Sequence, residues 1–173
     1  AYDSFGTNNG TLYNGPVWTA GRFNNALSFD GTDDYVSVPG SASLDINKTG
    51  TVEAWIYTTA TTQTNKSIIS KYDGHNCNQS NYLIYITSGS LVQGCIGDGT
   101  TNNATSTFAL PSDWTHVAMT WDGSEVKLYK NGALVGTATA QTITPTANTS
   151  ALYIGGVAAS ANDFSGLIDD VAI

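Results

Sequence analysis

A series of short apolar runs, separated by turn residues, constrains the fold more than any other feature of this sequence. Within most runs apolar and polar residues alternate, and β-branched and aromatic residues are frequent, which is typical of β-strands. The runs are ALSFD (26–30), YVSVP (35–39), TVEAWIYT (51–58), SIISKY (67–72), YLIYIT (82–87), SLVQGCIG (90–97), WTHVAMTW (114–121), VKLYK (126–130), ALVGTAT (133–139), ALYIGG (151–156) and FSGLIDDVAI (164–173). About eleven or twelve strands in one chain predict an all-β fold, an antiparallel two-sheet sandwich or jelly roll, in a single domain over residues 1–173.

The composition argues against helices and for a folded core. Glu53 and Glu125 are the only glutamates, and lysine is also scarce, so the commonest exposed helix-forming residues are nearly absent. Hydrophobic residues make up 40% of the chain, which supplies a sizeable core. No apolar run reaches the roughly 18 residues that a membrane-spanning helix needs, so we expect no membrane insertion.

The charge balance excludes one class of partner. Six basic residues stand against 14 acidic ones, for a net charge of −8, so a nucleic-acid backbone would be repelled. Only 12% of the residues are charged, while Thr, Ser, Asn and Gly are abundant. A surface of neutral hydrogen-bonding side chains suits a secreted or cell-surface β protein.

Two sharp turns predict a three-stranded meander over residues 114–139. Asn131 and Gly132 match a type I′ hairpin turn, in which both central residues need a positive φ. Asp122 and Gly123 form a second tight turn between neighbouring runs.

The two cysteines, Cys77 and Cys95, flank a predicted hairpin in a region rich in Gly and Asn. A disulfide between them would close a loop of roughly 18 residues and favours an oxidising compartment. Two reduced, buried thiols are the alternative. Neither His75 nor His116 has the spacing to the cysteines that a metal site requires.

Five motifs in order carry a family resemblance: GRFNNALSFDGTDDYVSVP (21–39), TVEAWIY (51–57), DWTHVAMTWDGSEVKLYKNGALVG (113–136), LYIGG and FSGLIDDVAI. They resemble the laminin G-like jelly-roll domains of the concanavalin A-like lectin/glucanase superfamily, from about residue 3 to residue 173. The resemblance implies two curved antiparallel sheets, with a concave face and rim loops that bind glycans in many relatives. It also implies that a terminal strand is lacking at both ends, so that a neighbouring subunit or domain could complete the sheet edge.

The resemblance further implies a structural calcium ion. Asp169 matches the first Asp of the family's Asp-x-Val motif, which helps to bind calcium together with oxygens from the N-terminal segment. The expected companions are Asp30 or the Gly31 carbonyl, and Asp3 or Asn9, because calcium prefers hard oxygen ligands. The alternative is that these residues form only Asx turns.

For glycan binding, the useful chemistry is an aromatic platform beside planar polar groups. The loop that contains Tyr72, Asp73, His75 and Asn76 supplies these residue types, and the alternative is a solvated loop without a ligand. A second loop, GDGTTNN (97–103), has a similar composition. We expect Trp55, Trp114 and Trp121 to lie in the core, while Trp18 lies near a loop.

Catalysis is not expected. Glycosidases of the superfamily use two neighbouring carboxylates, but neither Glu53 nor Glu125 has an acidic residue two or three places away on its strand. No Gly-x-Ser-x-Gly motif is present, and His116 lies in a strand where relatives carry a structural histidine. The sequence thus predicts a non-catalytic extracellular module that binds a glycan or an extracellular protein. The alternative is a structural subunit of a surface layer, filament or adhesin.

Overall fold

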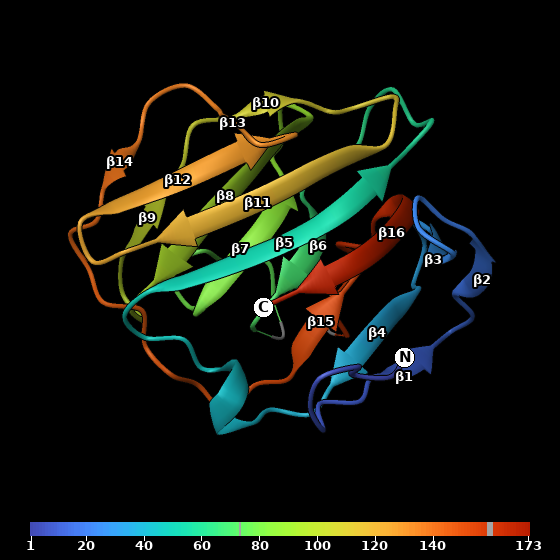
Figure 1. Cartoon of the computed structure of the whole chain (residues 1–173), viewed down its shortest axis with the longest axis horizontal. Coiled ribbons are helices and arrows are strands. Elements are labelled where there is room, and N and C mark those ends of the chain that lie inside the picture. The colour runs from blue at the N-terminus through green and yellow to red at the C-terminus, as the bar shows by residue number, and fades with distance from the viewer. Residues whose placement is uncertain (73, 159–160) are drawn as a thin grey trace.

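The structure is a computed structural model that describes residues 1–72, 74–158 and 161–173. Two antiparallel sheets, each of eight strands within these residues, lie face to face (Figure 1). The only helix in this part of the chain is a single 3-10 turn, Ala42–Leu44. The predicted all-β jelly-roll sandwich is therefore confirmed.

The front sheet, which faces the viewer in Figure 1, has the order β13-β12-β11-β5-β16-β3-β2, with β14 paired to β12. Its strands are β2 (Val17–Ala20), β3 (Asn25–Asp30), β5 (Gly50–Tyr57), β11 (Thr115–Trp121), β12 (Glu125–Lys130), β13 (Ala133–Leu134), β14 (Thr139–Ala140) and β16 (Ser165–Ala172).

The back sheet has the order β1-β4-β15-β6-β7-β8-β10, with β9 paired to β8. Its strands are β1 (Thr11–Tyr13), β4 (Tyr35–Val38), β6 (Lys66–Ser70), β7 (Tyr82–Ile86), β8 (Leu91–Gly97), β9 (Asn102–Ala104), β10 (Phe108–Ala109) and β15 (Leu152–Ile154).

The core fills the space between the two sheets with side chains from alternate strand positions. Ile56 and Met119 from the front sheet and Ile84 from the back sheet are fully buried there. Trp121 is also buried and its ring stacks on that of Tyr82, with centroids 5.8 Å apart. Alternation along each strand leaves the intervening side chains on the two outer faces.

The predicted meander forms, with one change at its end. Asn131 and Gly132 have φ values of 50° and 79°, and they join β12 to β13 as a two-residue turn. The expected strand over 133–139 is interrupted, because Gly136 has a φ of 62°. It becomes the short strands β13 and β14, which pair with opposite ends of β12.

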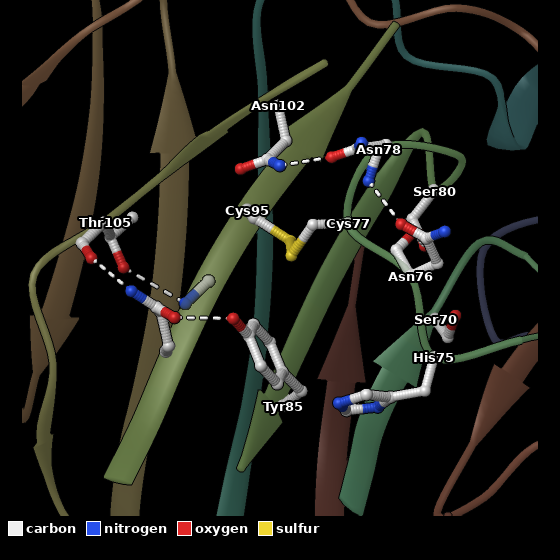
Figure 2. Close-up of a disulfide and its surroundings, with 12 residues drawn as sticks. Ser70, His75, Asn76, Cys77, Asn78, Ser80, Tyr85, Cys95, Asn102 and Thr105 are labelled. Atoms are coloured by element: carbon white, nitrogen blue, oxygen red, sulfur yellow. Dashed lines mark hydrogen bonds between the residues drawn. A yellow bond between two sulfur atoms is a disulfide. The ribbon is translucent and has the colours of Figure 1, made fainter. Parts of the chain in front are cut away.

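The disulfide between Cys77 and Cys95 is present and ties the loop before β7 to strand β8 of the back sheet (Figure 2). The loop backbone passes so close to β8 that a Cβ on Gly97 would lie 2.0 Å from the Cys77 carbonyl oxygen. Only glycine fits at this position. In the described part of the chain, no helix is long and apolar enough to cross a membrane.

Candidate functional site

Strand β5 places its side chains alternately on the two faces of the front sheet. Val52, Ala54 and Ile56 are buried in the core, so Trp55 points to the outer face. On the adjacent strand β11, His116 lies directly opposite Trp55. Their ring centroids are 5.4 Å apart and the ring planes are tilted by 51°. A pair of rings therefore stands on the outer face of the sheet.

A second pair of rings extends this surface. The centroids of Tyr57 and Trp114 are 5.7 Å apart, and both residues are half-buried. Glu53, on the same face of β5, places its Oε2 atom 3.5 Å from Nε2 of His116. The face thus combines broad apolar ring surface with an acidic and an imidazole group.

The turn between β2 and β3 brings Arg22 and Phe23 to the same face. Asn24 has a φ of 57°, a left-handed conformation that asparagine tolerates. The backbone N–H of Phe23 donates a hydrogen bond to Oδ2 of Asp169 at 2.8 Å, which fixes the turn to β16. The Phe23 ring meets the Trp55 ring edge to face, with centroids 5.7 Å apart.

The β12–β13 turn adds Asn131. Its Oδ1 atom accepts a hydrogen bond from the His116 backbone N–H at 2.9 Å. Its own backbone N–H donates to the His116 carbonyl, also at 2.9 Å. The hairpin turn is therefore held against β11, and Asn131 is exposed.

Together these elements enclose an open hollow of about 490 Å³, lined by Arg22, Trp55, Trp114, His116 and Asn131. We call it the aromatic hollow. Its walls offer ring faces for the C–H groups of a ligand and polar groups for its hydroxyls.

The expectation that Trp55 and Trp114 lie in the core is wrong, whereas that for Trp121 is confirmed. The sequence feature that could have placed Trp55 outside the core is its position between the buried residues of β5, because neighbouring residues of a strand point to opposite faces of the sheet. The same feature applies to Trp114, because in the predicted strand 114–121 it alternates with the buried residues Val117 and Met119 and so shares the outer face with His116. No feature of the sequence pointed to Arg22, Phe23 or Asn131 as site residues.

The residues predicted to bind calcium do not all lie together. Asp30 pairs with Ser165, and Asp169 lies four residues further along β16, which corresponds to about 13 Å of strand. Asp3 and Asn9 interact with each other in the N-terminal loop, where Asn9 Oδ1 accepts the Asp3 backbone N–H at 3.0 Å.

The Asp3 carboxylate also accepts backbone N–H bonds from its own loop, which lower the pKa of Asp3. Its oxygens are thereby used within the turn, as in the Asx-turn alternative.

Asp30 lies instead with Asp33 and Asp34 around the β3–β4 turn, which contains Gly31. One carboxylate oxygen from each of the three aspartates lies within 4.8 Å of the others. Burial raises the pKa of Asp34, and the negative charges of Asp30 and Asp33 add to that effect. Burial also raises the pKa of the neighbouring Asp163 to about 6. Clustered carboxylate oxygens of this kind fit the ligand preference of calcium.

The loop predicted to bind a ligand lies on the outer face of the back sheet, so it is separate from the aromatic hollow (Figure 2). The Tyr72 hydroxyl hydrogen-bonds Gln79 Oε1. Asn76 Oδ1 accepts the backbone N–H of Asn78 at 3.0 Å. Asp73 lies outside the described residues.

The His75 ring packs edge-on against Tyr85 of β7, with centroids 4.9 Å apart, and its Nδ1 atom is 3.1 Å from the Ser67 hydroxyl. Burial lowers the pKa of His75. Tyr72, His75 and Asn76 thus come from one loop, and their polar atoms mainly bind the loop to itself and to the sheet. Ligand binding at this loop stays a prediction.

Comparison with solved structures shows what the fold is similar to. The match to domain 4 of an extracellular arabinanase from Geobacillus stearothermophilus, in complex with arabinotriose, has a TM-score of 0.71 at 18% identity. It covers 94% of this chain and 80% of that one. The binding domain of Paraclostridial Mosquitocidal Protein 1 matches with a TM-score of 0.73 at 14% identity, covering 95% of this chain and 43% of that one.

The botulinum neurotoxin serotype G binding domain matches with a TM-score of 0.72 at 12% identity, and the match covers 94% of this chain and 42% of the toxin domain. The chain therefore spans less than half of either toxin fragment. No curated protein sequence matches the chain. The family model described as the concanavalin A-like lectin/glucanases superfamily matches residues 30–173. Since this match covers most of the sequence, the chain belongs to the concanavalin A-like lectin/glucanases superfamily, as a laminin G-like jelly roll.

Proposed function

We propose that this chain is a non-catalytic, extracellular carbohydrate-binding module, and that glycans bind in the aromatic hollow. The observation that carries the proposal is the make-up of that hollow. Trp55 and Trp114 supply ring faces, and Arg22, His116 and Asn131 supply polar groups at the edges. A sugar ring presents C–H faces and hydroxyl edges at the same time, so it requires both kinds of surface in one place.

The comparisons support a binding role. The arabinanase domain is described in complex with arabinotriose, and both toxin fragments are described as binding domains. The Cys77–Cys95 disulfide favours an oxidising compartment and so supports an extracellular setting.

The position of the glutamates supports a non-catalytic role. Glu53 lies on β5 and Glu125 on β12, with β11 between these strands, which separates the backbones by about 10 Å or more. Each glutamate has a basic partner: Glu53 lies near His116, and Glu125 is 2.6 Å from the Lys127 ammonium. A retaining glycosidase instead requires two carboxyl groups only about 5–5.5 Å apart.

A glycan array followed by titration calorimetry tests the proposal. We expect the protein to bind one or more glycans, and Trp114→Ala to weaken that binding by about tenfold or more, as truncation of a Trp anchor does. Trp18→Ala is the matched control, because Trp18 is exposed on β2 and does not line the hollow. If no glycan on a broad array binds, the proposed carbohydrate-binding function is excluded. If Trp18→Ala weakens glycan binding as much as Trp114→Ala does, the aromatic hollow is excluded as the binding site.

A second candidate function, assembly into a larger structure, is favoured by exposed apolar side chains near two sheet edges. These side chains lie on the N-terminal segment and on β1 and β2, each of which is an edge strand of its sheet. They are Tyr2, Phe5, Tyr13, Val17 and Trp18. A neighbouring subunit or domain could pair with an open edge of this kind.

Sedimentation velocity at several protein concentrations tests this candidate. We expect the wild-type protein to self-associate and Val17→Lys to abolish this association, because a charge on the edge strand opposes strand pairing. A monomer at all concentrations counts against self-assembly.

A further inference from the structure

We propose that the aromatic hollow selects sugars that carry a carboxylate, and that Arg22 recognises this group. The inference rests on the proposed function, because it assigns a class of ligand to the same site. It goes further in predicting that acidic sugars are preferred to their neutral counterparts, although the protein as a whole is strongly acidic.

The first step is the way in which Arg22 is held. Its guanidinium carbon lies 5.0 Å from the centroid of the Trp55 ring and 5.1 Å from that of Phe23. Such contacts hold the cation against the rings without using its N–H donors in conventional hydrogen bonds. The turn that carries Arg22 is itself fixed, because the Phe23 backbone N–H binds Asp169. The cation is therefore positioned before a ligand arrives.

The second step is that Arg22 has no anionic partner among residues 1–72, 74–158 and 161–173. Among the residues that the structure describes, ion pairs join Lys71 to Asp45, His116 to Glu53, and Lys127 to Asp122 and Glu125. Arg22 belongs to none of them. An arginine fork matches a carboxylate through two parallel hydrogen bonds, which a neutral hydroxyl cannot reproduce.

The third step is the uneven distribution of charge around the hollow. Arg22 lines the hollow, whereas Glu53 does not line it and places its Oε2 atom 3.5 Å from Nε2 of His116. A carboxylate on the ligand is attracted towards Arg22 and repelled from the side of Glu53. Asn131, whose Oδ1 is occupied by the His116 backbone, has its NH₂ group left for a ligand oxygen. This arrangement gives an acidic sugar one preferred orientation.

The net charge of −8 strengthens the assignment of carboxylate recognition to Arg22. General attraction of polyanions is excluded for a protein of this charge. Any preference for an acidic sugar must therefore come from a local group, and Arg22 is the only cationic side chain of Lys or Arg type that lines the hollow.

Matched pairs of sugars test the inference. The probes are trigalacturonate with its trimethyl ester, and 3′-sialyllactose with its methyl ester, preceded by an array that prints acidic glycans beside neutral counterparts. We expect the wild-type protein to bind the acidic member of at least one matched pair about tenfold more tightly, the usual scale for a charge-assisted hydrogen-bonded pair. Arg22→Gln should abolish this preference and retain the weaker, neutral binding. Arg22→Lys should restore part of it, because lysine keeps the charge and lacks the fork.

Lys48→Gln is the matched control, since it removes the same charge from an exposed residue outside the hollow. Equal affinity for acidic and neutral members, or a preference that survives Arg22→Gln, would overturn the inference. In that case the proposed function still stands if Trp114→Ala abolishes binding of neutral glycans. If no glycan binds at all, both proposals fail.

Discussion

His75 lies between the back sheet and the loop that the disulfide holds down, and its chemistry is set by that position. Its ring contacts Tyr85 edge-on and its Nδ1 atom approaches the Ser67 hydroxyl. Burial lowers the pKa of His75, so the folded protein favours the neutral ring. Protonation must therefore oppose this packing.

We predict that His75 makes folding stability depend on pH. The unfolded chain binds a proton at His75 near the ordinary pKa of about 6.5, whereas the folded chain binds it only at lower pH. This contribution to the free energy of unfolding is fully present above about pH 6.5 and is lost as the pH falls below that value.

Urea unfolding between about pH 5 and pH 8 measures the effect, across the usual titration range of histidine. The slope of stability against pH should be smaller in His75→Gln than in the wild type. Identical slopes would show that His75 is not responsible.

Single residues also show how far the sequence predicts the site. Trp55 is predictable, because Val52, Ala54 and Ile56 on either side of it are buried and a strand alternates. Arg22 is not, because its position depends on a hydrogen bond between Phe23 and Asp169, which are 146 residues apart. Sequence alternation reports the face of a strand, but it does not report where a turn is anchored.

The hairpin β7–β8 and the loop before it form one element through the disulfide. Cys95 lies in β8 opposite Leu83, and Cys77 lies in the loop that crosses the outer face of the back sheet. The Asn102 side chain on β9 donates a hydrogen bond to Asn78 in the same loop (Figure 2). The loop is thus attached to the sheet at several points.

We predict that replacing both cysteines with alanine lowers the free energy of unfolding by about 3 kcal/mol, the value expected for a closed loop of this length. Hydrogen exchange should accelerate in residues 74–81, whereas exchange in β5 and β11 should not change. Glycan binding in the aromatic hollow should also persist, because the loop lies on the opposite sheet. Loss of binding in the double variant would contradict this separation.

The β3–β4 turn contains Asp30 and Gly31 of the residues predicted to bind calcium, and its three aspartates form a different candidate set that can be tested. Calcium binding at Asp30, Asp33 and Asp34 would offset the mutual repulsion of their carboxylates, so we predict that added calcium raises the melting temperature and that a chelator lowers it. Asp33→Asn should remove most of the response, while Asp3→Asn should leave it. An unchanged melting temperature, with no metal found by elemental analysis, would exclude calcium at this turn.

The longer strands were predictable and the shortest ones were not. The runs at 26–30, 51–58 and 114–121 correspond to β3, β5 and β11, since each alternates over five or more residues. By contrast, β9 and β10 contain three and two residues and exist through their pairing with β8. Such strands depend on the partner strand, because their own sequences are too short to show a period.

At the scale of the whole molecule, Lys71 joins three segments that are distant in the sequence. Its side chain is fully buried, and its ammonium group lies 2.9 Å from Oδ1 of Asp45. The same group donates hydrogen bonds to both oxygens of Asn148 and to the Ser150 carbonyl, at 2.8–3.0 Å. Lys71 therefore fastens the segments before β5 and before β15 to the end of β6.

We predict that Lys71→Met lowers the free energy of unfolding by about 2–3 kcal/mol, because it leaves the Asn148 and Ser150 carbonyls without their donor and the partly exposed Asp45 without its cation. Lys48→Met, which alters an exposed lysine, should change the free energy of unfolding by less than about 0.5 kcal/mol. Chemical denaturation of the two variants makes the comparison. If Lys71→Met changes the free energy of unfolding as little as Lys48→Met does, the prediction is contradicted.

The alternation along β5 and β11 has a practical consequence for protein engineering. Residues that line the hollow and residues that fill the core occupy different positions of the same strands, so they can be varied independently. A combinatorial library randomised at Trp55, Tyr57 and His116 would change the outer surface of the front sheet while every inward position keeps its native side chain. The front sheet could then serve as a scaffold for new specificities, with its backbone held by hydrogen bonds to strands on both sides.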